Sequence, residues 1–276
     1  MLLYSHDTYG LGHFRRNSAI AHALRRQDPD ARVVMLTGSS YAGSWPLPVD
    51  VDIVSMPSVV KVGVDDYRPV NARSISGLTA EREHTIGSTL LEVRPDVFLV
   101  DHAPLGMKGE LKWALQLARH ELPQTRVVLG LRDVLDDPAT VRRTWDEQRI
   151  YPALASFYDL VLVYGCKELF DVTELYAFQP RVRRRTIFTG YIAKPYSLEP
   201  AADSRMVWAR SQPPGMRRVL VMGGGGGDAA ELLTAFLGAW PLISKRCRAE
   251  AALVTGPMMP DPDRRQIESL VAPLDQ

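Results

Sequence analysis

The sequence is poor in cysteine and has no long apolar run, and each scarcity excludes a class of protein. Its 276 residues include two cysteines, Cys166 and Cys247, which lie far apart and outside any C-x-x-C spacing. This usage argues against a disulfide framework and a cysteine metal site, and it fits a reducing compartment. No stretch reaches the length of a membrane helix, and the first residues read as a strand and not as a signal peptide. We therefore predict a cytoplasmic protein.

An excess of charge of one sign is also lacking. The chain has 33 Lys and Arg against 32 Asp and Glu, a formal net charge of +1. Arginine pairs recur along the chain, so a basic run such as residues 181–185 is typical of a solvated surface. Contact with anionic lipid headgroups stays open. We predict no nucleic-acid partner, and we leave open a peripheral position at the inner membrane face.

The most distinctive stretch that is present holds five consecutive glycines: Gly223, Gly224, Gly225, Gly226 and Gly227. An apolar strand pattern over residues 218–222 precedes them, and a helical pattern begins at Asp228. This order places backbone N–H groups at the positive end of a helix dipole, where they bind phosphate without help from side chains. Glycine also allows the close approach and the positive φ angles of such a turn. The stretch predicts a phosphate site from Gly223 to Asp228.

Other interpretations of the glycine loop are weaker or remain open. No Lys-Ser or Lys-Thr follows, so the loop is not a Walker A sequence. A dinucleotide fingerprint would need an acid at the end of the next strand, and that strand ends in Thr255-Gly256, so NAD is disfavoured. A flexible turn without a ligand stays open. Asp228 and Glu231 also fit a helix cap.

The start of the chain shows the same order of a strand, a glycine loop and a helix. A short strand over residues 2–5 leads into a loop with Gly10 and Gly12, and a helical pattern with an apolar face follows. These elements are half of a βαβ unit. Arg15 stands where a dinucleotide fingerprint would have its third glycine, so this loop is not a dinucleotide site.

Strand and helix patterns alternate through the rest of the chain. We expect strands at residues 32–36, 52–56, 96–100, 126–131, 160–164, 186–189 and 251–255. We expect helices at residues 78–92, 108–120, 139–154, 167–177, 229–240 and 263–271, and a long loop over residues 43–73. Apolar strands separated by helices predict parallel sheets covered on both faces. The prediction is an α/β protein with two Rossmann-like, doubly wound domains.

The predicted domains have distinct boundaries. The N-terminal domain covers residues 1–192, and a Pro-rich linker covers residues 193–216. A partial C-terminal domain covers residues 217–276.

Two such domains, each with a glycine turn after its first strand, resemble the GT-B architecture. Residues 4–16 (YSHDTYGLGHFRR), residues 188–191 (FTGY) and the Gly223–Asp228 turn resemble predicted glycosyltransferases related to the peptidoglycan N-acetylglucosaminyltransferase. The resemblance covers essentially the whole chain. It implies metal-independent transfer of a sugar from a nucleotide diphosphate sugar to a hydroxyl acceptor. No cofactor is expected beyond this donor substrate, and a lipid-linked acceptor stays open.

The resemblance departs from the family in the second domain, which has fewer βα units than the family's donor domain. We therefore expect that domain to be incomplete, with an exposed sheet edge that favours self-association. Two alternatives follow. One is a catalytically inactive, truncated homologue that binds a sugar nucleotide or a partner. The other is a sugar-nucleotide epimerase of the same fold, although the first glycine turn favours the transferase.

The resemblance also implies roles for residues of the first turn. It places His13 at the cleft as the general base, because a neutral imidazole there can take the acceptor's proton. A hydrogen-bonding turn residue is the alternative for His13. Gly10, Gly12 and Arg15 would face the acceptor, and the Gly223–Asp228 turn would bind the donor diphosphate.

Further candidates follow from the position of ligands in open α/β sheets, which bind at the carboxyl ends of strands. Asp101 and His102 follow one predicted strand, and Arg132 and Asp133 follow another. Arg132 and Asp133 fit a role in orienting a sugar or a phosphate. A local ion pair and a helix cap explain them equally well.

Overall fold

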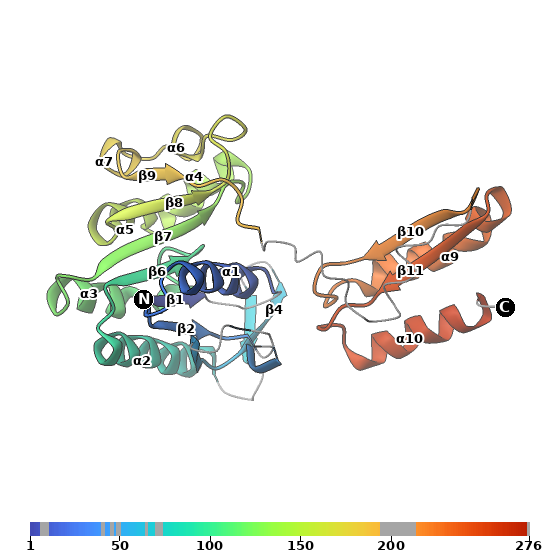
Figure 1. Cartoon of the computed structure of the whole chain (residues 1–276), viewed down its shortest axis with the longest axis horizontal. Helices are drawn as coiled ribbons and strands as arrows, with labels where there is room; N and C mark the ends of the chain where they lie inside the picture. The colour runs from blue at the N-terminus through green and yellow to red at the C-terminus, as the bar shows by residue number, and fades with distance from the viewer. Residues whose placement is uncertain are drawn as a thin grey trace. The chain divides into compact units, whose positions relative to one another are not determined.

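The computed structural model describes residues 1–5, 11–39, 42–44, 47, 51–63, 66–69, 74–193 and 214–274. The chain divides into two compact units, Met1–Lys194 and Pro195–Gln276 (Figure 1). We call them the first and second unit and describe each by itself. Most of the predicted linker lies outside the described residues, so the predicted domain boundaries stay predictions.

The first unit is built on a seven-stranded sheet in which every neighbouring pair is parallel. In sheet order the strands are β3 (Val51–Ser55), β2 (Val33–Thr37), β1 (Leu2–Ser5), β6 (Val97–Asp101), β7 (Arg126–Arg132), β8 (Leu160–Tyr164) and β9 (Thr186–Phe188). The central strands are apolar and buried on both faces, as in sheets covered by helices. The predicted parallel α/β class is confirmed.

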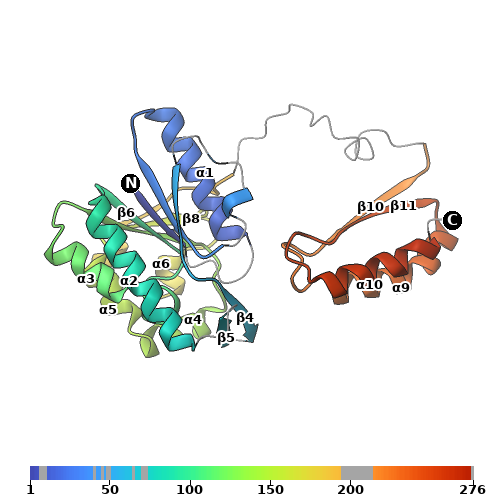
Figure 2. The same cartoon turned by 90° about the horizontal axis from the view of Figure 1, so that it is seen from below.

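Helices cover the two faces of this sheet unequally. The helices are α1 (Gly12–Gln27), α2 (Ile75–Val93), α3 (Lys112–His120), α4 (Pro138–Glu147), α5 (Ile150–Phe157), α6 (Val172–Leu175) and α7 (Pro180–Arg183), with 3-10 turns η1 (Ala42–Ser44) and η2 (Met107–Gly109). Figure 2 shows α1 on one side of the sheet and α2, α3 and α5 on the other. Strand β1 contributes side chains to two apolar clusters. Leu3 packs in the cluster with Phe14 of α1, and Leu2 packs in the larger cluster with Ile86 of α2.

A buried ion pair joins the sheet to the α2 side. Arg82 of α2 and Glu110 are both buried, with 2.6 Å between Arg82 Nε and Glu110 Oε2 and 2.8 Å between Arg82 Nη2 and Glu110 Oε1. The hydroxyl of Tyr4 donates to the same carboxylate. Burial raises the pKa of Tyr4, and the charge of Glu110 adds to this shift. The network satisfies a carboxylate that would otherwise be costly to bury.

Three predicted elements of the first unit differ in the structure. The predicted loop over residues 43–73 contains an antiparallel pair, β4 (Val59–Gly63) and β5 (Asp66–Pro69). The predicted helix over residues 139–154 is two helices, because Arg149 has a φ of 60° and breaks the helix. The predicted helix over residues 167–177 contains one short helix, α6.

The second unit pairs β10 (Arg217–Met222) with β11 (Ala249–Val254) in parallel. Helices α9 (Ala230–Arg246) and α10 (Asp261–Val271) run along the same side of this pair (Figure 2), and a 3-10 turn, η4 (Ala272–Leu274), follows α10. The core holds Val221, Leu233 and Ile267, whereas the exposed large side chains of the strands are Leu220, Met222 and Val254. In the described part of this unit, helices therefore cover one face of the strand pair.

Helix α9 is longer than predicted. The sequence pattern ended it at Trp240, since proline disfavours a helix interior. The structure continues the helix through Pro241 to Arg246. Within the described ranges, none of the helices combines the length and apolar character needed to cross a bilayer.

Candidate active site

His13 and Asp101 form a hydrogen-bonded pair at the carboxyl end of the sheet. His13 lies in the first turn of α1, and Asp101 is the last residue of β6, the strand beside β1. His13 Nδ1 lies 2.6 Å from Asp101 Oδ2; the Asp101 side chain is fully buried, and 17% of the His13 side chain is exposed. A carboxylate that accepts from Nδ1–H fixes the neutral ring with its lone pair on Nε2. This arrangement suits a general base.

Arg16 shares the same carboxylate. Its Nη1 lies 2.8 Å from Asp101 Oδ1 and 2.9 Å from Oδ2, and 3.5 Å from His13 Nδ1. Sequence reasoning selected Arg15 and missed Arg16. The spacing held a signal, because residues three apart on a helix share a face, and Arg16 is three residues after His13.

Tyr164 packs against Arg16 and was also missed. The guanidinium carbon of Arg16 lies 5.2 Å from the centroid of the Tyr164 ring. Tyr164 ends β8, so the rule that selected Asp101 at the end of β6 also applied to it. Burial raises the pKa of Tyr164, and the charge of Asp101 raises it further while Arg16 opposes the shift.

The hydroxyl of Tyr164 lies above Gly130 of β7. A Cβ at Gly130 would stand 1.9 Å from this oxygen, so the tyrosine can occupy its place only because residue 130 is glycine. The hydroxyl is buried without a hydrogen-bond partner among the described residues. His102 has a φ of 70°, and its amide donates to the Gly130 carbonyl at 2.7 Å. The centroid of its ring lies 4.9 Å from that of His13, so Asp101, His102 and His13 come together as one cluster.

Among the described residues, the side chains of Arg132 and Asp133 form no hydrogen bond or ion pair with this cluster. Asp133 accepts from the Tyr191 hydroxyl at 2.8 Å, and its other oxygen accepts from the Val134 amide. Gly165 provides the space, since a Cβ there would lie 2.5 Å from Asp133 Cβ. The hydrogen bond to Asp133 raises the pKa of Tyr191.

The alternative interpretation of Arg132 and Asp133, a local ion pair and a helix cap, is wrong for the residues that the structure describes. Arg132 is exposed and makes no ion pair there with Asp133. The cap of α4 is Asp137, whose carboxylate accepts from the amides of Ala139 and Thr140.

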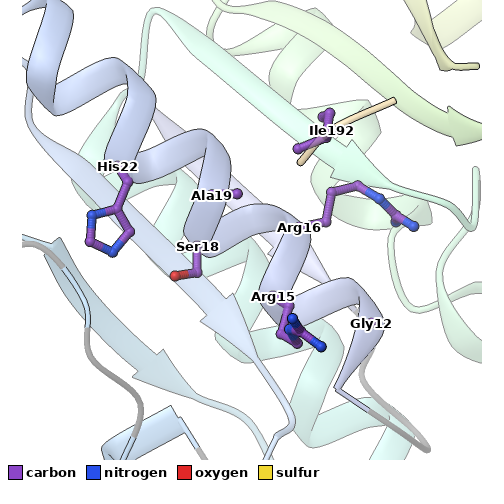
Figure 3. A pocket seen from close by; sticks show the side chains of 7 residues that line it. All are labelled: Gly12, Arg15, Arg16, Ser18, Ala19, His22 and Ile192. Carbon is purple, nitrogen blue, oxygen red and sulfur yellow. The ribbon is translucent and has the colours of Figure 1, made fainter. Parts of the chain in front are cut away.

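A hollow of about 240 Å³ runs along α1 beside this cluster. Its lining consists of Gly12, Arg15, Arg16, Ser18, Ala19, His22 and Ile192 (Figure 3). The lining carries cationic and neutral side chains and no acidic one among the described residues. Gly12 and Arg15, expected to face the acceptor, are both part of it. Gly10 lies outside the described residues.

The glycine turn of the second unit is held closely against the end of β11. Gly226 has a φ of 95°, and a Cβ there would lie 1.9 Å from the Thr255 carbonyl oxygen. The Met258 amide donates to the Gly225 carbonyl at 2.8 Å. Arg264 of α10 braces the other side, donating to Thr255 Oγ1 at 2.6 Å and to the carbonyl of Gly256 at 2.9 Å.

The helix after the glycine turn begins without the expected cap. Its N-cap is Ala229, with no side-chain hydrogen bond, and Asp228 is exposed. The Asp228–Glu231 capping interpretation is therefore wrong. In residues 214–274, the amides of Gly224 and Gly227 donate no hydrogen bond, so both are available to a ligand at the N-terminus of α9.

Solved structures resemble this chain at low sequence identity, while no protein-family model and no curated protein matches it. A UGT transferase from Siraitia grosvenorii in complex with UDP is 14% identical, with a TM-score of 0.53. That match covers 95% of this chain, which spans 63% of the other protein. UGT2 of Phytolacca americana, complexed with UDP-2-fluoro-glucose and pterostilbene, is 15% identical, with a TM-score of 0.57 over 97% of this chain and 69% of that one.

The UDP-GlcNAc 2-epimerase of Methanocaldococcus jannaschii is also similar. It is 12% identical, with a TM-score of 0.51 over 100% of this chain and 69% of that one. Likenesses at 12 to 15% identity show the fold alone. The predicted architecture is confirmed at that level: the chain has the GT-B fold that UDP-dependent glycosyltransferases share with UDP-GlcNAc 2-epimerases.

Proposed function

We propose that this protein is a glycosyltransferase that moves a sugar from a nucleotide diphosphate sugar to a hydroxyl acceptor without a metal. The observation that carries the proposal is the His13–Asp101 pair. Asp101 orients the imidazole through Nδ1, and Nε2 is the atom proposed to take the proton of the attacking hydroxyl. The nearby hollow along α1 offers space for an acceptor.

The donor diphosphate is proposed to bind at the Gly223–Asp228 turn. Backbone amides at the start of α9 would stabilise the charge of the leaving diphosphate, as a metal does in other enzymes. The glycines allow this approach because the turn contains positive φ angles at Gly224 and Gly226. The fold neighbours support the choice, since one contains UDP and another a UDP-sugar analogue.

The acceptor is proposed to lie along α1, next to His13. Arg15 and Arg16 give the hollow a cationic lining, which suits an acceptor that carries a phosphate. A lipid-linked acceptor has such a group, and the likeness to the peptidoglycan transferase group points the same way. A peripheral position at the inner membrane face follows from this acceptor class. A role of Arg132 and Asp133 in orienting a sugar or a phosphate stays a prediction.

The test is a donor screen with the whole chain, comparing the wild type with His13→Ala. We expect product formation to fall by about 10² to 10⁴ in kcat/KM for the variant, the range of a general base. His120→Ala, at an exposed position in the last turn of α3, is the matched control and keeps wild-type activity. Unchanged turnover in His13→Ala would remove the base assignment.

An epimerase is the second candidate, because one fold neighbour is a UDP-GlcNAc 2-epimerase. The same screen separates the two activities. A transferase consumes the donor only with an acceptor hydroxyl and joins the sugar to it. An epimerase changes the sugar with no acceptor present. Donor binding without either reaction would identify a binding protein.

A further inference from the structure

We propose that Arg16 is a positioning residue that sets the charge of the His13–Asp101 pair and keeps His13 neutral. The proposal deepens the proposed function and rests on it where His13 is called a base. It begins from the shared carboxylate: Arg16 Nη1 contacts both oxygens of Asp101, and His13 Nδ1 contacts one of them.

Because the Asp101 carboxylate is buried, its contact with Arg16 has a strong effect on the charge of its other partner, His13. None of the Asp101 side chain is exposed, and 15% of the Arg16 side chain is. Solvent and salt therefore screen the contact weakly. A buried carboxylate needs a compensating cation, because an unpaired buried charge is costly.

The charge balance follows directly. Without Arg16, the His13 ring is the other basic group of the described residues that contacts Asp101, and it would bind a second proton and lose the lone pair on Nε2. With Arg16, the carboxylate is already compensated and a second cation beside the guanidinium is disfavoured. His13 then stays neutral, with Nδ1–H directed at Asp101.

Among the residues that the structure describes, the other titratable groups facing His13 do not replace Arg16. From the turn after β6 comes His102, whose ring centroid is 4.9 Å away, and a second imidazolium there would repel a charged His13. From β8 comes Tyr164, which remains a neutral phenol because its pKa is raised. Arg16 is thus the fixed cation of the described cluster.

Tyr164 holds Arg16 in place, and Gly130 makes room for Tyr164. The tyrosine ring lies under the guanidinium at 5.2 Å, a cation–π contact that restricts the arginine to the Asp101 side. The ring reaches this place because residue 130 lacks a Cβ. Its hydroxyl has no partner among the described residues, so the tyrosine acts here through its ring.

The experiment measures the protonation of His13 in the full chain, with Arg16→Gln and Arg16→Lys. Nitrogen-15 NMR of the imidazole rings follows each histidine against pH, and the spectrum of His13→Ala assigns the His13 signals. We expect Arg16→Gln to move the titration midpoint of His13 upward by about 1 to 3 pH units, the usual effect of a charge at this range. Arg16→Lys restores most of the wild-type midpoint. Arg26→Gln removes an exposed arginine of the same helix and leaves the midpoint unchanged.

The outcomes are separable from those of the proposed function. An unmoved midpoint in a folded Arg16→Gln variant overturns the proposal. If the midpoint is unmoved while acceptor KM rises, Arg16 is a substrate ligand of the hollow instead. An upward shift supports the proposal even if no donor is turned over, and that result would count against the transferase alone. With turnover, the acid limb of the kcat/KM profile moves with the NMR midpoint.

Discussion

Asp101 connects the two side chains on which the candidate active site depends. Its carboxylate accepts from His13 and Arg16 while none of its own surface is exposed. The pair joins positions 88 residues apart in the chain. Its geometry assigns Asp101 the orientation of the imidazole, whereas in the proposed mechanism the proton of the acceptor moves to His13 Nε2.

At this scale we predict that Asp101→Asn lowers kcat/KM for sugar transfer by about 10² to 10⁴ with little change in acceptor KM. An amide that presents its NH2 group toward Nδ1 would favour the other tautomer and place the proton on Nε2. Initial rates over a range of acceptor concentrations measure the effect. Asp146→Asn, at an exposed position of α4, controls for loss of one carboxylate. A variant with the wild-type rate would remove Asp101 from the mechanism.

Residue types alone predicted part of this site. His13 was visible from the motif around it, and Asp101 from its place after an apolar strand. Their contact depends on which strands are neighbours, and the alternation of strands and helices does not state that β6 lies beside β1. Arg16 was hidden by the arginine pair, since adjacent residues on a helix point in different directions and the pattern does not show which one faces the sheet.

Among the elements, the glycine turn of the second unit fits closely against the end of a strand. The turn lies against the β11 end, where Gly226 and Gly256 both have positive φ, and a Cβ on Gly256 would lie 2.4 Å from the Gly225 carbonyl oxygen. The glycine turn and the end of β11 thus pack together, and Arg264 stabilises this packing through its hydrogen bonds to Thr255 and Gly256. The repeated glycines of the sequence predicted a close approach to a phosphate, which stays a prediction. The packing of the turn against the end of β11 became visible only in the fold.

We predict that Gly226→Ala destabilises the second unit and weakens nucleotide diphosphate binding by at least tenfold. The added Cβ would overlap the Thr255 carbonyl at a φ that alanine rarely adopts. Gly238→Ala is the matched control, because position 238 is inside α9 with no atom within 4 Å of the added Cβ. There the change should stabilise by about 0.5 to 1 kcal/mol. Urea unfolding and calorimetric titration with UDP measure both variants, and equal behaviour of the two would contradict the packing argument.

The elements that prediction missed have physical reasons in the fold. Composition marked residues 43–73 as a loop, yet β4 and β5 pair with each other inside it. Whether two short strands pair depends on their tertiary context, which local β-propensity does not determine. Helix α9 passes Pro241 because the residues on both sides keep helical geometry, although proline removes one backbone hydrogen bond.

Across the first unit as a whole, buried tyrosines make the folded state sensitive to alkali. Burial raises the pKa of both Tyr4 and Tyr158 well above 10, their value in the unfolded chain. Above pH 10 the unfolded chain releases protons that the folded chain keeps. Stability from these groups is therefore present below pH 10 and is lost as the pH rises beyond it.

We predict that the free energy of unfolding falls above pH 10 by about 1.4 kcal/mol per pH unit for each of these tyrosines. Urea titrations between pH 9 and pH 11.5, followed by circular dichroism, measure the slope. Tyr158→Phe should reduce the slope by about 1.4 kcal/mol per pH unit, because it removes one proton from the balance. A slope that is the same in the variant and the wild type would exclude Tyr158 as a source.

The order of strands in the first sheet also determines when, during translation, each strand gains its neighbours. Of the strands of this sheet, β1 comes first in the sequence but lies between β2 and β6. At ribosomal rates of about 5 to 20 residues per second, the roughly ninety residues between β1 and β6 take on the order of 5 to 20 s to appear. Until then one edge of β1 lacks its partner and can pair with another chain. His13 at the start of α1 is therefore made seconds before Asp101, and a nascent chain that ends before residue 101 carries the histidine without its partner.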